Sequence, residues 1–172
     1  MFRAISRVIF TSAALAVLAA CQPAPDPLVG SPSAALNVAA AQMKSAGTLP
    51  EQINLQRVNA GLPLLTRDSR LTAAAEAHAL DMATMGTLTH IGSTGYTVGT
   101  RVRLQGYCYN VVSENIASGW KTVALVVRGW MDSPGHRANI LNSQVSEYGV
   151  GRAGDYWVMI YGDPRPGDCS LF

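Results

Sequence analysis

The apolar run near the amino terminus limits where and how this chain can fold. Residues 8–20 form a run of 13 mostly apolar or small side chains, and Arg3 and Arg7 lie in front of them. A membrane-spanning helix needs about 20 apolar residues, so this run is too short to cross a bilayer. A basic segment followed by a short apolar one is typical of a secretory signal peptide. We therefore expect residues 1–20 to be cleaved and the remainder to fold outside the cytoplasm.

The run ends in Leu18-Ala19-Ala20-Cys21, which resembles the lipobox of bacterial lipoproteins. The resemblance implies cleavage before Cys21 and diacylation of that cysteine, whose acyl chains would enter one leaflet of a membrane. An ordinary signal peptide followed by a chance cysteine is the alternative. Gln22 stands where an aspartate would imply retention in the inner membrane, so the outer membrane or its periplasmic face is favoured. The predicted location is the bacterial cell envelope, with the membrane as a partner through Cys21.

Four prolines follow the predicted anchor, at positions 23, 25, 27 and 32, and residues 34–46 are rich in alanine. Proline-rich segments favour an extended conformation of about 3.1 Å per residue. We expect residues 21–48 to form a tether and residues 49–172 to form one folded domain. The sequence contains no internal repeat.

The charge balance of the exported part is neutral. The chain has 13 Lys and Arg residues against 11 Asp and Glu residues, and two of the arginines are Arg3 and Arg7 of the signal peptide, which leaves 11 of each sign. Proteins that bind nucleic acid usually cluster Lys and Arg on one face. The mature chain has only two lysines, so nucleic acid is not an expected partner.

Two cysteines remain once Cys21 carries lipid. Cys108 and Cys169 would lie in an oxidising compartment, where a disulfide between them is the natural interpretation. It would close a loop of about 60 residues, for which the chain-entropy model gives roughly 4 kcal/mol of stabilisation. A zinc-binding pair is the alternative, and the long separation in sequence disfavours it.

The folded part alternates helix and strand patterns, which predicts an α/β layered domain. Helices are expected at 50–59, 98–105 and 121–131. Two more have recognisable caps: one begins after Asp68 and ends at Met85, and the other begins at Pro134, after Ser133 as its cap, and ends at Leu141. Strands are expected at 107–117, 147–152 and 156–161, with a tight turn at Gly154-Asp155 between the last two.

Three polar residues stand out against this pattern. His78 lies on the apolar face of the second helix, Glu114 lies in a strand rich in apolar residues, and His136 lies in the first turn of a helix. A buried imidazole or carboxylate needs partners, and the helix dipole disfavours a positive charge at His136. We therefore expect a neutral imidazole at His136, suited to binding a metal or accepting a proton. Taken alone, His78 reads as a core histidine with satisfied hydrogen bonds.

The same segments resemble a known family. They are Asn54 to Leu64, Ala75 to Ala83, Ser113-Glu114-Asn115-Ile116-Ala117, Trp130 to Leu141, and the closing stretches at Tyr148 to Gly151 and Tyr156-Trp157. In this order they are similar to the CAP superfamily, also called SCP domains, and to its bacterial branch. The resemblance covers about residues 50–162 and implies an α-β-α sandwich with a central cleft.

The resemblance also implies a set of cleft residues. His78, Glu114 and His136 are the primary candidates, and together they could bind a divalent metal such as zinc or magnesium with room for a water molecule. The second acidic residue of the family cleft is absent, because Ser133 stands at that offset from Trp130. Ser133, Asn115 and His90 are secondary candidates. Ser133 already serves as a helix cap, so a catalytic Ser133–His136 pair is disfavoured.

Three functions are open at this point. The favoured one is a non-catalytic binding module of the envelope, whose cleft takes a lipid, a peptide or a divalent metal. A metal-assisted hydrolase or peptidase of envelope material is the second, although the sequence has no HExxH motif and no clear carboxylate base. The third is a structural protein in which the polar cluster is a buried network that fixes the fold. We expect His136→Ala to separate them, because it would abolish binding in a functional site and lower stability in a structural one.

Overall fold

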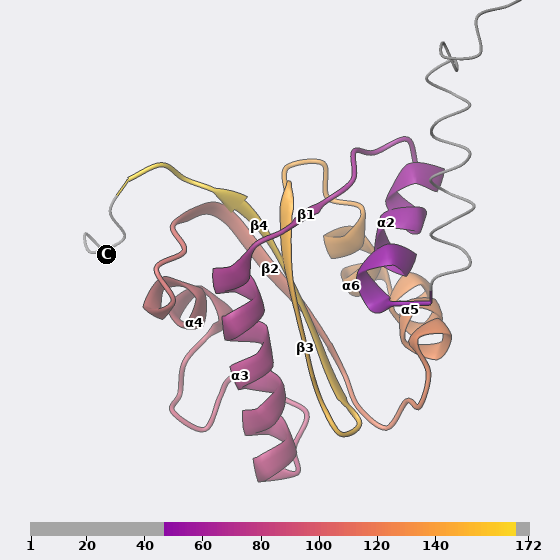
Figure 1. The fold of residues 1–172 in the computed structure, drawn as a ribbon. Coiled ribbons are helices and arrows are strands. Elements are labelled where there is room, and N and C mark those ends of the chain that lie inside the picture. Colours follow the sequence, from indigo (N-terminus) through magenta and orange to yellow (C-terminus); the bar gives the residue numbers. More distant parts are fainter. Residues whose placement is uncertain (1–46, 168–172) are drawn as a thin grey trace, which may run out of the picture.

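The computed structural model describes residues 47–167 of the chain (Figure 1). The predictions made for residues 1–46, including Cys21 and the tether, and for Cys169 lie outside the described residues. The elements follow one another in this order: α2 (Leu49–Asn59), β1 (Thr66–Arg67), α3 (Ser69–Met85), α4 (Val98–Leu104), β2 (Tyr109–Ala117), α5 (Val123–Asp132), α6 (Pro134–Ile140), β3 (Glu147–Ala153) and β4 (Tyr156–Pro164).

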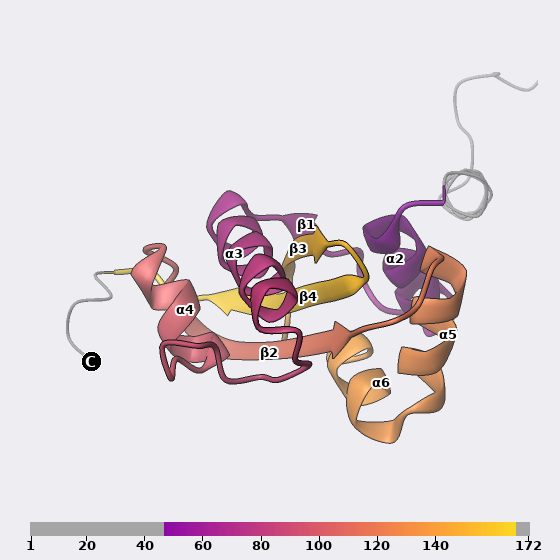
Figure 2. The ribbon, with the colours of Figure 1, turned by 90° about the horizontal axis from the view of Figure 1, so that it is seen from below.

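A four-stranded sheet forms the middle layer of the domain. Its strand order is β1-β3-β4-β2, in which β2 and β3 pair antiparallel with β4 and the short β1 pairs parallel with β3. Helices α3 and α4 cover one face, whereas α2, α5 and α6 cover the other (Figures 1 and 2). The expected α-β-α sandwich in a single α/β domain is therefore confirmed. Strand β2 lies at one edge of the sheet, which becomes important for the site.

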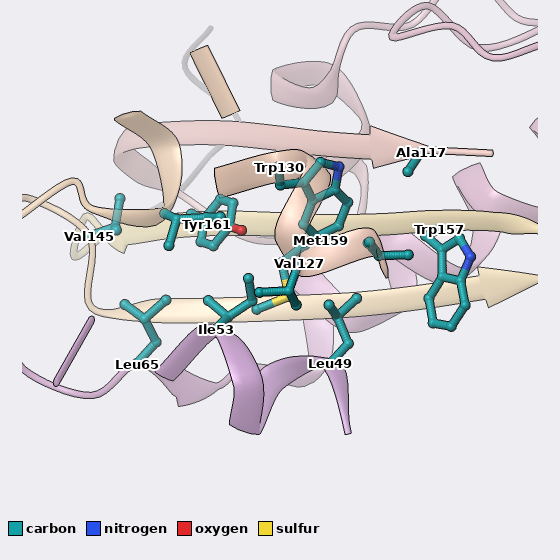
Figure 3. Packing of buried hydrophobic residues seen from close by; sticks show 12 residues of the cluster. Leu49, Ile53, Leu65, Ala117, Val127, Trp130, Val145, Trp157, Met159 and Tyr161 are labelled. Atoms are coloured by element: carbon teal, nitrogen blue, oxygen red, sulfur yellow. The ribbon is translucent and has the colours of Figure 1, made fainter. Parts of the chain in front are cut away.

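Strand β4 is buried on both faces because a helical layer covers each side. Its residues alternate between two cores, as the period-2 geometry of a strand requires. Trp157, Met159 and Tyr161 pack against α2, α5 and α6 (Figure 3), and Val158 and Ile160 pack against α3 and α4. The strand therefore reads as a continuous apolar run rather than an alternating one, which is expected for a central strand covered on both sides.

Helix α3 lies unusually close to β3. A Cβ atom built on Gly149 would lie 2.1 Å from the backbone of Leu71, and one built on Gly151 would lie 2.3 Å from the backbone of Ala75. These two glycines are two residues apart and therefore lie on the same face of β3. The helix residues that they approach, Leu71 and Ala75, are four apart and lie on the same face of α3, so these two faces pack against each other. The close approach brings the side chains of α3 down to the level of the sheet.

The helix ends follow the signals in the sequence with one exception. Asp68 caps α3 by accepting hydrogen bonds from the backbone N–H groups of Arg70 and Leu71, and Gly86 ends the helix in the left-handed conformation with φ of 65°. Ser133 precedes α6 as expected, but its side chain makes no capping hydrogen bond. The prediction that the Ser133 side chain caps α6 is therefore wrong.

Two differences from the predicted elements have local causes. Strand β2 begins at Tyr109 rather than at 107, because the N–H of Tyr107 still bonds the carbonyl of Val102 and so completes the turn after α4. The two-residue strand β1 is not predicted, since two residues carry no periodicity that could be recognised.

Buried Arg57 of α2 ties that helix to the connection between α6 and β3. Its guanidinium donates to the carbonyl oxygens of Pro63 at 2.9 Å, Ile140 at 2.9 Å and Asn142 at 2.7 Å. Backbone carbonyls thus satisfy a charged group that is only 1% exposed. Within residues 47–167, none of the helices combines the length and the apolar character that crossing a membrane would require.

Candidate functional site

The candidate site surrounds the edge strand β2. Glu114 pairs with Ile160 and Asn115 pairs with Met159, and directly opposed residues of paired strands share a face. Glu114 therefore points toward the α3 and α4 layer, and Asn115 toward the α5 and α6 layer. Because β2 is the edge strand of the sheet that residues 47–167 form, groups from the two helical layers can meet around it.

Glu114 is the centre of a buried ionic cluster. Its side chain is only 1% exposed. Arg101 Nη2 donates to Glu114 Oε2 at 2.5 Å, and His90 Nδ1 donates to Oε1 at 2.8 Å. Both oxygens of this buried carboxylate therefore have a partner, a guanidinium on one and an imidazole on the other.

Arg101 also holds the loop that carries His90. Its Nη1 donates to the carbonyl oxygen of His90 at 2.9 Å and to that of Tyr96 at 2.8 Å. A second contact fixes the same loop to α3, since the backbone N–H of Ser93 donates to Asp81 Oδ2 at 2.8 Å. Several hydrogen bonds therefore fix the segment between α3 and α4. The position of His90 is set by this loop conformation as well as by its hydrogen bond to Glu114.

His78 lies in the cluster but is turned away from solvent. Its Nε2 donates to the carbonyl oxygen of Thr89 at 2.9 Å and lies 3.9 Å from Glu114 Oε1. In the neutral ring Nδ1 then carries no proton, and this buried atom has no hydrogen-bond partner among residues 47–167. Burial lowers the pKa of His78, against an opposing influence of Glu114. The structure thus buries His78 as expected of a core histidine but satisfies only one of its two ring nitrogens.

His90 is the imidazole of the cluster that ligands can reach. Its side chain is 55% exposed while its Nδ1 hydrogen bond to Glu114 orients the ring. In the tautomer that donates from Nδ1 to Glu114, the other ring nitrogen, Nε2, carries no proton and can accept a hydrogen bond. The sequence pattern ranks His90 behind His78, whereas the structure puts His90 in direct contact with Glu114 and leaves His78 at a longer distance.

His136 approaches the cluster from the other helical layer. It lies in the first turn of α6, half-buried, with its ring centroid 6.4 Å from that of Trp130. Burial lowers its pKa, and the neighbouring His90 lowers it further, so the ring is neutral as expected. The backbone of His136 lies against β2, because its carbonyl oxygen accepts a hydrogen bond from the side chain of Asn115.

Asn115 fixes the position of the α6 backbone beside this site. Its Nδ2 donates to the carbonyl oxygen of His136 at 3.0 Å, and its Oδ1 accepts from Asn139 Nδ2 at 2.9 Å. Asn139 also reaches the carbonyl oxygen of Glu114 at 3.3 Å. The asparagine pair therefore connects the strand to the helix that carries His136, and Asn115 acts through position rather than by contact with a ligand.

A hollow of about 240 Å³ lies behind the cluster, between α3, the following loop and α4. His78 and Arg101 form its polar wall, and Ala77, Tyr96 and Leu104 contribute apolar surface. It shares its wall with the Glu114 cluster and is part of the same site.

The predicted metal set does not have the arrangement that a metal site requires. Within residues 47–167, no group of three or more His, Cys, Asp and Glu side chains could hold an ion. His78 Nε2 is engaged by a backbone carbonyl, and the oxygens of Glu114 are engaged by Arg101 and His90. A guanidinium beside the carboxylate also repels a second cation. The hydrogen-bonded cluster instead consists of Glu114, Arg101 and His90. His78 Nε2 lies 3.9 Å from Glu114 Oε1, and the ring of His136 contacts that of Trp130.

Arg101 is the functional residue that sequence reasoning missed. A signal for it existed, because Arg101 lies three residues after Val98 and directly before Val102 in the predicted 98–105 helix, on its apolar side. A charged residue on an apolar helix face needs a buried partner. The sequence could not identify that partner as Glu114, which belongs to another element.

Comparison with known proteins agrees with this fold and this order of motifs. The family model described as the cysteine-rich secretory protein family, CAP, matches residues 51–161. The Bacillus subtilis protein YkwD is 37% identical over 109 residues, which is 62% of this chain and 42% of that protein. The chain thus spans less than half the length of this curated relative.

Two solved structures are similar as well. One is an extracellular protein containing an SCP domain from Bacillus anthracis, with a TM-score of 0.65 and 28% identity over 71% of this chain and 43% of that chain. The other is an outer surface protein of Borrelia burgdorferi, with a TM-score of 0.63 and 27% identity over 68% of this chain and 90% of that chain. A family match over more than half of the sequence decides the class: this chain belongs to the CAP superfamily.

Proposed function

We propose that this CAP protein is exported, carries lipid on Cys21 and works at the surface of an envelope membrane. The signal-peptide pattern and the Leu18-to-Cys21 motif support this proposal. The location of two relatives supports it too, since one is described as extracellular and the other as an outer surface protein. A disulfide from Cys108 to Cys169 belongs to the same proposal. Its support is that Cys108 Sγ lies 3.1 Å from the carbonyl oxygen of Gly167, two residues before Cys169.

We further propose that the domain is a binding module that takes a peptide segment of an envelope partner. The observation that carries this is the exposed His90 ring, which a hydrogen bond to the buried Glu114 orients, together with the half-buried His136 on α6, whose pKa burial lowers. Two such imidazoles can accept a hydrogen bond from, or donate one to, the amide groups of a peptide backbone. Because Arg101 already compensates the charge of Glu114, the site favours an uncharged polar group over an ion.

Apolar side chains beside His90 fit the same kind of ligand. Leu88, two residues before His90, is 46% exposed, and Ile91, the residue after it, is 47% exposed. A peptide offers both apolar side chains and polar backbone groups at this spacing, whereas a metal would need neither leucine nor isoleucine. An acyl chain would use the apolar surface but leave the imidazoles without a partner.

The test uses the purified chain and an immobilised library of short synthetic peptides. We expect a subset to bind, and we expect His90→Ala and His136→Ala each to weaken that binding at least about tenfold with little change in thermal midpoint. Glu76→Gln, an exposed position of α3 outside the cluster, is the matched control. Peptides that bind both variants as tightly as the parent chain would overturn the peptide proposal.

Three other outcomes would support a different ligand or role. Lipid extracted with the protein and identified by mass spectrometry would favour a lipid-binding module. Micromolar zinc uptake in calorimetry would favour a metal-dependent role. A large fall in the thermal midpoint of His136→Ala, with no loss of peptide binding, would favour a structural network.

One observation favours hydrolysis as a second candidate function. A carboxylate that orients an imidazole, which presents its other nitrogen to solvent, is the arrangement of a general base. His90 Nε2 would take a proton from a water molecule as the water oxygen attacks a peptide carbonyl. The imidazolium would then give that proton to the amine, which leaves as the C–N bond breaks and the carboxylic acid forms. Cleavage of a bound peptide by the parent chain, lost in His90→Ala and retained in Glu76→Gln, would establish it. Binding without any cleavage would exclude it for that peptide.

A further inference from the structure

A second hollow lies on the other helical layer, beside α5 and the end of β2. It has a volume of about 430 Å³, within the usual range for small-ligand sites. Its walls are contributed by Trp120, Lys121, Leu125, Arg128, Gly129 and Asp132. None of these residues belongs to the Glu114 cluster, so a ligand of this hollow would be independent of the function proposed above.

The indole of Trp120 forms a fixed wall of this hollow. Its ring lies so close to α5 that a Cβ atom on Gly129 would fall 1.4 Å from the ring carbon Cη2, so the indole packs where only a glycine leaves room. The backbone of Trp120 is fixed as well, because its carbonyl oxygen accepts a hydrogen bond from Trp157 Nε1 at 2.9 Å. A ligand that contacts this ring would therefore meet a surface that is already in place, which lowers the entropic cost of binding.

The polar part of the same indole is available to a ligand. Trp120 Nε1 makes no hydrogen bond to any residue in the range 47–167, and it is not among the buried unpartnered atoms of that range. Its N–H is thus not fully buried and has no hydrogen-bond acceptor among these residues. Leu125, which is 40% exposed, adds apolar surface on the helix side of the hollow.

The charges around the hollow are mixed and cancel. Lys121 Nζ is paired with Asp155 Oδ2 at 2.5 Å, which leaves Arg128 and Asp132 as the charged groups that remain. These two exposed residues lie four positions apart on α5, and neither forms an ion pair with another described residue. The hollow thus offers a guanidinium donor, a carboxylate acceptor and no net charge.

We infer that this hollow binds a neutral oligosaccharide, with one sugar ring against Trp120. A pyranose ring has two apolar C–H faces and a rim of hydroxyl groups, each of which both donates and accepts hydrogen bonds. The indole and Leu125 match the apolar faces, and Arg128, Asp132 and the indole N–H match the rim. An anionic lipid headgroup would be repelled by the carboxylate of Asp132. A purely apolar ligand would make no hydrogen bond to Arg128 or Asp132.

The experiment titrates the purified full chain with cellotetraose and chitotetraose, two neutral β-linked oligosaccharides, by calorimetry and tryptophan fluorescence. We expect at least one to bind with a dissociation constant below about 1 mM. Trp120→Phe, which keeps an aromatic ring but removes the N–H and part of the stacking area, should weaken binding about three- to tenfold. The double change Arg128→Gln and Asp132→Asn should weaken it by a similar factor without changing the thermal midpoint, because both side chains are exposed.

Matched controls separate this site from the rest of the molecule. Tyr96→Ala removes an aromatic ring that is 42% exposed on the opposite layer and should leave sugar affinity unchanged. His90→Ala should also leave it unchanged, so failure of the peptide proposal and failure of this one can be told apart. Absence of binding for both sugars at about 10 mM would overturn the inference. Equal binding by the parent chain, Trp120→Phe and the α5 double variant would do the same.

Discussion

Replacing Arg101 with methionine tests the central claim about the site, that a buried charge pair holds it together. Removal of one partner from a buried ion pair costs about 3–5 kcal/mol, because the other charge stays buried without compensation. Glu114 is 1% exposed and the Arg101 side chain 10% exposed, so water could replace little of the lost contact. Domains of this size unfold with about 5–15 kcal/mol, so we expect the thermal midpoint to fall by roughly 10–20 °C.

The assay is urea unfolding at pH 7, followed by tryptophan fluorescence, for the parent chain, Arg101→Met, Glu114→Gln and the double variant. The double variant should be more stable than the sum of the single losses predicts, by about 2 kcal/mol or more, because it leaves no unpaired charge. Arg103→Met, which removes an exposed arginine of α4 that lies over the Tyr109 ring, is the control and should cost no more than about 1 kcal/mol. A cost below about 1 kcal/mol for Arg101→Met, or single losses that add within about 0.5 kcal/mol, would refute the reasoning.

Three further predictions concern the imidazole core, the helix–strand contact and the disulfide. Burial lowers the pKa of His78, so as the pH falls the unfolded chain takes up a proton at this imidazole before the folded chain does. The free energy of unfolding should therefore be retained above about pH 6.5 and decrease toward pH 5. In His78→Gln this decrease should be shallower. Gly151→Ala should cost about 1–3 kcal/mol or more in urea unfolding, whereas Gly135→Ala, whose added methyl would have no atom within 4 Å, should cost little. Cys108 and Cys169 should resist alkylation in mass spectrometry until a reductant is added, and two free thiols would contradict the pairing.

Most of the fold could be predicted from local pattern. The Asp68 cap, the end of α3 before Gly86 and the apolar face that carries His78 depend on residues close in sequence, and the structure confirms each of them. The Gly154-Asp155 turn between β3 and β4 is predicted for the same reason. The two-residue β1 escapes prediction because it exists only through pairing with β3, which lies about 80 residues later.

The site could be predicted only in part. Glu114, His136 and Asn115 are recognisable from their segments, yet the sequence pattern ranks His78 and His90 the other way round from their contacts with Glu114. A helical face predicts that His78 is buried, but it does not predict that the carbonyl of Thr89 engages its Nε2. The loop position of His90 gives no sign of contact with a strand 24 residues later.

By itself, the sequence determined the succession of the helices and of the longer strands, the family, and most of the polar residues that need partners, because caps, periodicity and burial preference operate between neighbours along the chain. Tertiary structure alone decided which partner each of them found. Three such contacts depend on distances between elements. They are the close packing of α3 on the glycines of β3, the ion pair of Arg101 with Glu114, and the packing of the Trp120 ring against Gly129. Those distances are set by the packing of whole layers, which no local pattern records.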